Sequence, residues 1–253
     1  MRHKATPCLP ALAVLIAALT FPLAAAAQDA PAGAAAAAPA AGAGPVAKPK
    51  PTDSSEAVAA MTLAAQLVEQ GRKNKSPLAL AAGAELYASV GVKLADRAKT
   101  SEGGQAPAAG AEPAPVPAPD AAALYAEAAA AARAASDEAL AEAIEKSASA
   151  AGSRSSESGG YARGHRDRVQ PYATDVYVVR YAGGEDARAT VAAIDETDDI
   201  DLYVYDGDGW VAALDRNESG VGICVWVPEY TRDYTLKVIN RMGSQVDYLL
   251  YTN

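Results

Sequence analysis

The feature that most constrains the fold is a series of short segments in the last third of the chain, in which apolar and polar residues alternate. Alternation with period two sends successive side chains to opposite faces of a strand, and Gly-rich and Asp-rich turns separate the segments. Seven short strands without helical spacers predict an antiparallel β-sandwich over residues 169–253, which we expect to fold on its own. The segments are residues 174–182, 187–194, 200–206, 210–214, 221–227, 233–240 and 246–252.

Two pairs of helices are predicted before the sandwich. The first is a helical hairpin over residues 53–99, in which Ser76-Pro77 provides a cap and a first-turn proline. Gly91 ends this pair, or residues 92–98 prolong it. The second pair covers residues 120–150. The apolar faces are mostly alanine and bury little area, so we expect a loose bundle or spacer, with a partner-binding helical platform as the alternative.

Three stretches of low complexity separate these parts. Residues 28–52 and 100–119 are rich in Ala and Pro, and residues 151–168 are rich in Ser, Gly and Arg. Such compositions bury too little apolar surface to offset the entropy of ordering. We therefore predict three disordered linkers.

The first 27 residues resemble a secretory signal peptide. Arg2 and Lys4 precede an apolar run at residues 11–23, and Ala25-Ala26-Ala27 provides small residues for cleavage. The run is shorter than the ~20 apolar residues that a membrane span needs, so cleavage is favoured over a transmembrane anchor. We predict export to the bacterial periplasm or the cell exterior, with no membrane span after cleavage.

The charge balance and the known motifs argue against several function classes. The chain has 22 Lys and Arg against 31 Asp and Glu, a formal charge of −9, which disfavours nucleic acid as a partner. It lacks the nucleophile elbow, the zinc-protease motif and the phosphate-binding glycine loop. The mature chain keeps one histidine, His165, in a predicted linker, and one cysteine, Cys224, in a predicted strand. We assign neither a catalytic role, and we predict no enzymatic activity. Cys224 leaves only an intermolecular disulfide open.

Acidic residues crowd the region around the third predicted strand. Closely spaced carboxylates repel one another, and Ca²⁺ prefers six to eight oxygen ligands from such loops. The alternative is a solvated acidic turn in which Asp and Gly serve turn geometry. No cofactor is certain, and the candidate Ca²⁺ ligands are Asp198, Asp199, Asp201, Asp206 and Asp208.

Two tyrosines on the same strand are the candidate ligand-binding residues. If Leu202 and Val204 face the core, Tyr203 and Tyr205 point to the opposite side. Exposed tyrosines on a sheet suit a polysaccharide or protein surface, because they offer flat area with a polar tip. The alternative is that a neighbouring layer covers them.

Five short motifs follow one another in the C-terminal segment. They are Thr-Asp-Asp-Ile-Asp-Leu-Tyr-Val-Tyr-Asp at 197–206, Gly-Asp-Gly at 207–209, Val-Trp-Val-Pro at 225–228, Tyr-Thr-Leu-Lys-Val-Ile-Asn at 234–240 and Tyr-Leu-Leu-Tyr-Thr-Asn at 248–253. Their order and spacing resemble the bacterial pre-peptidase C-terminal domain, a small jelly-roll-like sandwich, over about 80 residues. Ile200 departs from the leucine usual in that family, the helical half has no counterpart there, and the family's usual peptidase domain is not seen in this sequence. The resemblance implies an accessory role in export, localisation or binding, without catalysis.

Together these observations predict an exported, non-catalytic accessory protein. Its sandwich is expected to serve binding or localisation on a protein or polysaccharide surface, with Ca²⁺ as a candidate stabiliser. One alternative is a structural protein that meets its partner through the helices. A second is a secreted hydrolase with an unrecognised site.

Overall fold

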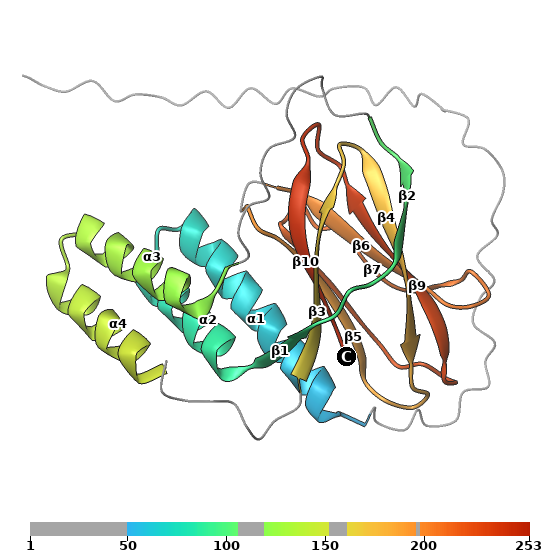
Figure 1. Ribbon diagram of the computed structural model, residues 1–253, viewed down its shortest axis with the longest axis horizontal. Coiled ribbons are helices and arrows are strands. Elements are labelled where there is room, and N and C mark those ends of the chain that lie inside the picture. Colours follow the sequence, from blue (N-terminus) through green and yellow to red (C-terminus); the bar gives the residue numbers. More distant parts are fainter. Residues whose placement is uncertain (1–49, 106–118, 152–160, 196–197) are drawn as a thin grey trace, which may run out of the picture. The chain divides into compact units, whose positions relative to one another are not determined.

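The structure, a computed structural model, describes residues 50–105, 119–151, 161–195 and 198–253 (Figure 1). These residues belong to one compact unit that spans residues 47–253, whereas the predicted signal peptide and most of the first predicted linker lie outside the described residues. The predicted fold class, helices followed by a C-terminal β-sandwich, is confirmed. The helices are α1 (Asp53–Lys73), α2 (Pro77–Ser89), α3 (Ala121–Ala134) and α4 (Glu138–Ala151).

Ten strands form two five-stranded sheets that pack face to face. Sheet 1 has the order β1-β3-β10-β5-β8, and sheet 2 has the order β2-β4-β9-β6-β7. All neighbours are antiparallel except β1 and β3. The strands are β1 (Gly91–Leu94), β2 (Lys99–Gly103), β3 (Tyr161–Val169), β4 (Ala173–Tyr181), β5 (Ala187–Ala193), β6 (Ile200–Tyr205), β7 (Val211–Asp215), β8 (Val221–Trp226), β9 (Arg232–Asn240) and β10 (Val246–Thr252).

The core between the sheets is built by the alternating residues of the predicted strands. In β9, for example, Leu236 and Val238 are buried while Thr235 and Lys237 are partly exposed. The seven predicted segments coincide with β4 to β10 to within one residue at each end. The largest fully buried side chains between the sheets are Tyr177, Tyr248, Ile200, Leu202, Leu236, Leu250, Val169, Val191 and Val204.

Three strands come from segments that the sequence assigned elsewhere. β3 occupies the second half of the predicted linker 151–168, β2 begins the predicted linker 100–119, and β1 lies inside the predicted helical hairpin 53–99. The charged residues in these segments made them resemble solvated linkers. The partners that pair with such residues are far away in sequence, so the sequence alone does not reveal them. In β3, Arg168 forms an ion pair with Asp247 of β10, with N and O atoms 2.8 Å apart.

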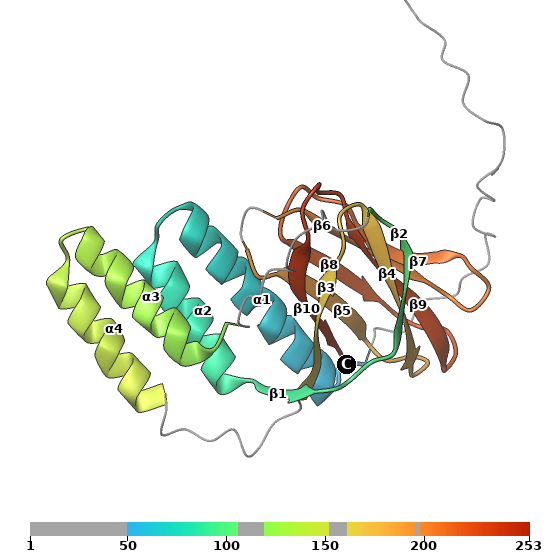
Figure 2. The ribbon, with the colours of Figure 1, turned by 45° about the horizontal axis from the view of Figure 1, so that its top comes forward.

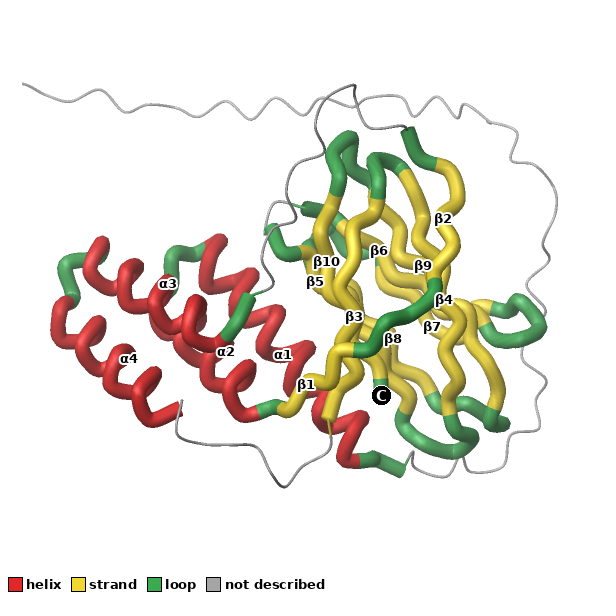
Figure 3. The backbone as a smooth tube through the Cα atoms, in the orientation of Figure 1, coloured by secondary structure: helices red, strands yellow, loops and turns green. Residues whose placement is uncertain are grey.

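The segment that joins β1 to β2 crosses the side of the sandwich from sheet 1 to sheet 2 (Figure 3). β1 pairs with β3 at the edge of sheet 1, and β2 pairs with β4 at the edge of sheet 2. Residues 169–253 therefore form seven of the ten strands, and the edge strands β1 and β2 come from the first half of the chain. Independent folding of residues 169–253 stays a prediction, and in this structure three further strands complete their two sheets.

The helices begin and pack as their sequences dictate. Thr52 caps α1, and Ser55 completes a capping box. Ser76 and Asp120 cap α2 and α3 with side-chain oxygens that accept backbone N–H groups, as predicted for Ser76. Gly71 does not end α1. It lets α2 approach, because a Cβ atom at this position would lie 2.8 Å from Leu80.

Helix α1 lies on the outer face of sheet 1, and the other three helices stack beyond it (Figure 2). Val58 and Met61 pack against Leu249 and Tyr251 of β10. Since α1 covers one face of β10 and the core covers the other, every residue of β10 is buried. The expectation of a loose bundle or spacer is wrong for α1, because small alanines let the helix come close to the sheet.

Two polar contacts fix the position of α1 on sheet 1. The hydroxyl oxygens of Thr62 and Thr190 lie 2.6 Å apart in a buried hydrogen bond. The backbone N–H of Gly220 donates to the Glu69 carboxylate at 3.1 Å. Thr62 also donates to the Val58 carbonyl and Glu69 also pairs with Lys73, so these side chains link α1 to the sheet with their polar groups satisfied.

Met61→Ala is expected to lower the free energy of unfolding by about 3 kcal/mol, because it opens a cavity between α1 and β10. Leu63→Ala is the matched control, since Leu63 is 49% exposed on the same helix and Met61 is fully buried. The control should change stability by less than about 0.5 kcal/mol. Urea unfolding of both variants measures the difference, and equal losses would contradict the docking of α1 on the sheet.

Candidate functional site

Tyr203 and Tyr205 lie on the outer face of sheet 2, as predicted. Leu202 and Val204 of the same strand are fully buried, so the tyrosines point away from the core and are partly exposed. Their rings are nearly parallel, with centroids 6.2 Å apart and an angle of 10° between the planes. Side chains two residues apart on one strand point to the same side, so the two rings lie next to each other on this face in nearly parallel planes.

Strand β9 supplies the next row of this face. Lys237 lies opposite Tyr203, and Thr235 lies opposite Tyr205. The Lys237 ammonium is 6.0 Å from the Tyr205 ring centroid and forms an ion pair with Glu102 of β2 at 2.9 Å. This pairing neutralises the lysine, so the centre of the face carries little net charge.

On the other side of the tyrosines, β7 adds exposed aliphatic side chains that the sequence did not single out. Leu214 lies opposite Tyr203 and Val211 lies opposite Tyr205. Both are about half exposed, and Trp210 in the preceding turn is 67% exposed. The signal was present in the sequence, because this short strand has apolar residues at outward as well as inward positions.

We call this surface the tyrosine face, defined by residues from four strands of sheet 2. Across the sheet its rows run from β4 through β9 and β6 to β7. The rows combine aromatic, aliphatic and hydroxyl groups with one neutralised lysine. Its members are Val176, Val178, Tyr203, Tyr205, Val211, Leu214, Thr235 and Lys237.

The acidic residues beyond the tyrosine strand serve a turn and an ion pair. Asp206 accepts hydrogen bonds from the backbone N–H groups of Asp208 and Trp210, each at 2.9 Å, and Gly209 takes the positive φ that the turn requires. Arg232 lies 2.7 Å from Asp208 and 3.7 Å from Asp206. Turn geometry, rather than a cation, accounts for these two aspartates.

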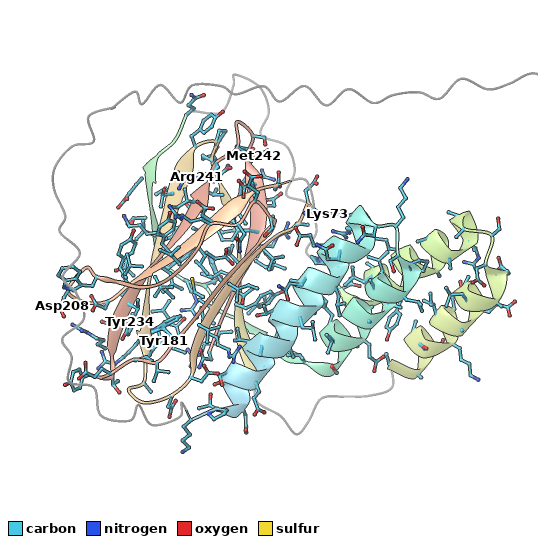
Figure 4. All side chains as sticks on the ribbon, turned by 180° about the vertical axis from the view of Figure 1, so that it is seen from behind. Lys73, Tyr181, Asp208, Tyr234, Arg241 and Met242 are labelled. Atoms are coloured by element: carbon cyan, nitrogen blue, oxygen red, sulfur yellow. The ribbon has the colours of Figure 1, made fainter. Side chains whose placement is uncertain are left out.

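The other candidate ligands lie at the opposite end of β6. Asp201 pairs with Arg241 at 2.9 Å, and one oxygen of Asp199 is buried without a hydrogen-bond partner. Burial, with the charges of Asp201 and Glu218, raises the pKa of Asp199. Figure 4 shows Asp208 and Arg241 far apart on the sandwich, so the five predicted ligands do not converge.

The described residues contain no group of three or more His, Cys, Asp or Glu side chains arranged to hold a metal ion. Arg232 and Arg241 already pair with three of the five carboxylates that a cation was expected to relieve, namely Asp206, Asp208 and Asp201. Stabilisation by Ca²⁺ stays a prediction, which the melting temperature with and without CaCl₂ would test.

Asp198 is expected to oppose folding at neutral pH. Burial, with the charges of Asp195 and Asp247, raises its pKa to about 6. A carboxyl whose pKa is higher in the folded than in the unfolded state takes up protons on folding, so stability rises as the pH falls from 7 to about 4. Asp198→Asn should therefore stabilise the protein at pH 7.5 by about 1 kcal/mol, after allowance for solvent screening, and by nothing near pH 4. Denaturant unfolding at both pH values measures this, and a gain of equal size at pH 4 would contradict it.

His165 and Cys224 lie inside the sandwich. His165 was expected in a solvated linker, but it belongs to β3 and is buried. Its ring and the Tyr177 ring form a T-shaped pair, with their centroids 5.3 Å apart. Cys224 is buried as predicted, and burial raises the pKa of its thiol to about 12. A buried thiol with a raised pKa is a poor nucleophile and cannot reach a second chain, so the open intermolecular disulfide is excluded in this fold.

The polar groups around His165 form a network that closes the side of the sandwich. Lys99 lies 2.7 Å from Asp167 and 2.8 Å from Asp175, and the Tyr248 hydroxyl donates to Asp175 at 2.8 Å. Burial favours the neutral form of Asp167, but hydrogen bonds from Lys99, the Arg168 backbone and His165 outweigh it, so the pKa of Asp167 is lowered. These groups satisfy one another, which identifies the network as structural.

Lys99→Met is expected to lower the free energy of unfolding at pH 7 by about 3 kcal/mol, because it leaves the fully buried Asp175 carboxylate without its counter-charge. Lys146→Met is the control, since Lys146 is exposed on α4. Urea unfolding should show no comparable loss for the control. If the two variants lose the same stability, Lys99 does not hold the two sheets together.

Comparisons with known proteins add little to this geometry. No family model matches the chain, and no curated protein matches it. A de novo designed double-stranded β-helix aligns over 36% of this chain and 99% of its own, at 14% identity and a TM-score of 0.25. A family two carbohydrate esterase from Cellvibrio japonicus aligns over 33% of this chain and 25% of its own, at 14% identity and a TM-score of 0.20. Among the described residues, no helix is both long and apolar enough to cross a bilayer.

Proposed function

We propose that this protein is an exported, non-catalytic accessory protein that binds a polymer surface, polysaccharide or protein, through its tyrosine face. The observation that carries the proposal is the parallel pair of Tyr203 and Tyr205, flanked by exposed Leu214 and Val211. Two parallel aromatic rings with polar tips offer apolar area to a repeating ligand, and aromatic side chains lose little conformational entropy on binding.

The arrangement of the two sheets supports this choice of face. Sheet 1 is covered by α1, whereas the tyrosines of sheet 2 remain partly exposed. Single exposed apolar residues are ordinary, but a contiguous set of them over neighbouring strands is typical of an interaction site. The pairing of Lys237 with Glu102 also favours an uncharged ligand over a strongly charged one.

Sequence features support the proposed export and localisation. The N-terminal basic and apolar residues have the order of a cleaved signal peptide. The resemblance of the last 80 residues to pre-peptidase C-terminal domains implies an accessory role beside other exported proteins. Both arguments come from the sequence.

The helical half offers a second candidate function. An open groove of about 480 Å³ lies between α2, α3 and α4, and it is lined mainly by alanines with Tyr125. Such a groove favours the alternative in which a protein partner meets the helices. This candidate and the leading proposal differ in which variants lose binding.

The test uses the full-length chain and a pull-down from bacterial envelope extract, with purified peptidoglycan, cellulose and chitin as defined probes. Replacing both Tyr203 and Tyr205 with Ala should weaken binding about tenfold or more, because buried aromatic contacts contribute about 1–3 kcal/mol each. Tyr230→Ala is the matched control, since Tyr230 is 64% exposed outside the tyrosine face.

Retained binding by the double variant would overturn the assignment to the tyrosine face. Ala148→Trp fills the helical groove and serves as the opposing variant. If this change alone abolishes binding, the helical platform is the site. Circular dichroism confirms that each variant keeps its fold.

A further inference from the structure

The side of the sandwich has an opening next to the segment that crosses between the sheets. β2 pairs with β4 only as far as Tyr177, so no described strand pairs with the last four residues of β4 on that side. An open cavity of about 460 Å³ lies here. Three arginines from three different elements line it, namely Arg97, Arg163 and Arg180.

Arg97 belongs to the crossing segment and is held in place at both ends. Its backbone N–H donates to Nδ1 of His165 at 3.3 Å, and a terminal nitrogen of its guanidinium donates to the Thr252 hydroxyl. Its Nε is buried and has no hydrogen-bond partner. A buried N–H without an acceptor costs free energy, so the protein itself does not fully satisfy the donors of this guanidinium.

Arg163 lies on β3 beside the same spot. It is directly opposite Thr252 in the pairing of β3 with β10, which places it at the same end of sheet 1 as the Arg97 anchor. The side chain is exposed. In the part of the chain that the structure describes, no carboxylate forms an ion pair with Arg97 or Arg163.

The acidic groups nearby do not neutralise these two arginines. Asp186 lines the cavity, but it pairs with Arg188 at 2.8 Å, and Arg180 is paired with Asp233 at 3.2 Å. Glu185 also lines the cavity. Burial lowers the pKa of Arg97, and the positive charge of Arg163 lowers it further. Two neighbouring guanidinium groups without ion-pair partners repel each other. In a chain with a formal charge of −9, an anionic ligand between them would relieve this repulsion.

We propose that Arg97 and Arg163 form a binding site for an oxyanion, a carboxylate or phosphate group that bridges the two guanidinium groups at the side of the sandwich. Guanidinium forks bind both groups through paired N–H donors, and Arg97 and Arg163 line the same cavity without an ion-pair partner among the described residues. The cavity shares Val178 with the tyrosine face, but Arg97 and Arg163 lie outside that face, at the side of the sandwich.

The test measures the melting temperature of the full-length chain in sodium phosphate, sodium acetate or sodium chloride at equal ionic strength. Isothermal titration calorimetry measures the heat of binding of the same anions. A specific oxyanion raises the melting temperature above the chloride value, because it binds the folded state alone. Arg97→Gln and Arg163→Gln should each weaken binding about tenfold or more, since each removes a charge-assisted pair.

Arg216→Gln is the control, since Arg216 is exposed in the β7–β8 turn and its loss changes the net charge equally. Arg163→Gln keeps the test valid should Arg97→Gln disturb the crossing segment. A response to phosphate alone identifies a phosphate ligand, and a response to acetate alone identifies a carboxylate. Equal responses in chloride, or an unchanged response in Arg163→Gln, overturn the proposal.

Discussion

The docking of α1 on sheet 1 determines which outer face of the sandwich is covered and which is exposed. A two-layer sandwich has two outer faces, and α1 covers one of them through Val58, Met61 and the hydrogen bond between Thr62 and Thr190. β10 consequently becomes a strand buried on both sides. Sheet 2 keeps its outer face open, and the tyrosine pair lies on that face.

A second constraint is that charged groups close the edge of the sandwich between the two sheets. The chain passes from β1 to β2 across this edge, and Lys99 holds carboxylates of β3 and β4 from between the sheets. Edge strands with unpaired backbone groups invite association, so covering them is a common device. The same crossing brings Arg97 beside Arg163, which ties the proposed anion site to the closure of the edge.

The sequence revealed the elements whose partners are local or whose pattern is regular. Strands β4 to β10 alternate clearly, and Ser76 marked the start of α2. The outward direction of Tyr203 and Tyr205 followed from period two alone. These features depend on residues a few positions apart, so one sequence suffices to find them.

The remaining features depend on partners far away in sequence. β3 contains Arg163, His165 and Arg168, a composition that suggests a solvated linker until Asp247 and Lys99 are in place. The acidic run suggested a cation site, because the sequence does not reveal that Arg232 and Arg241 fold back to pair with it. An alanine-rich helix likewise gives no sign that its small residues permit close approach to a sheet.

Hydroxyl-radical footprinting of the full-length chain tests most directly the claim that one outer face is covered and the other open. The structure predicts oxidation of Tyr203, Tyr205 and Leu214, with protection of Met61, Leu249 and Tyr251 beneath α1. Methionine is intrinsically the more reactive residue, so its protection is a demanding result. Oxidation of Met61 as fast as that of the exposed tyrosines would contradict the account.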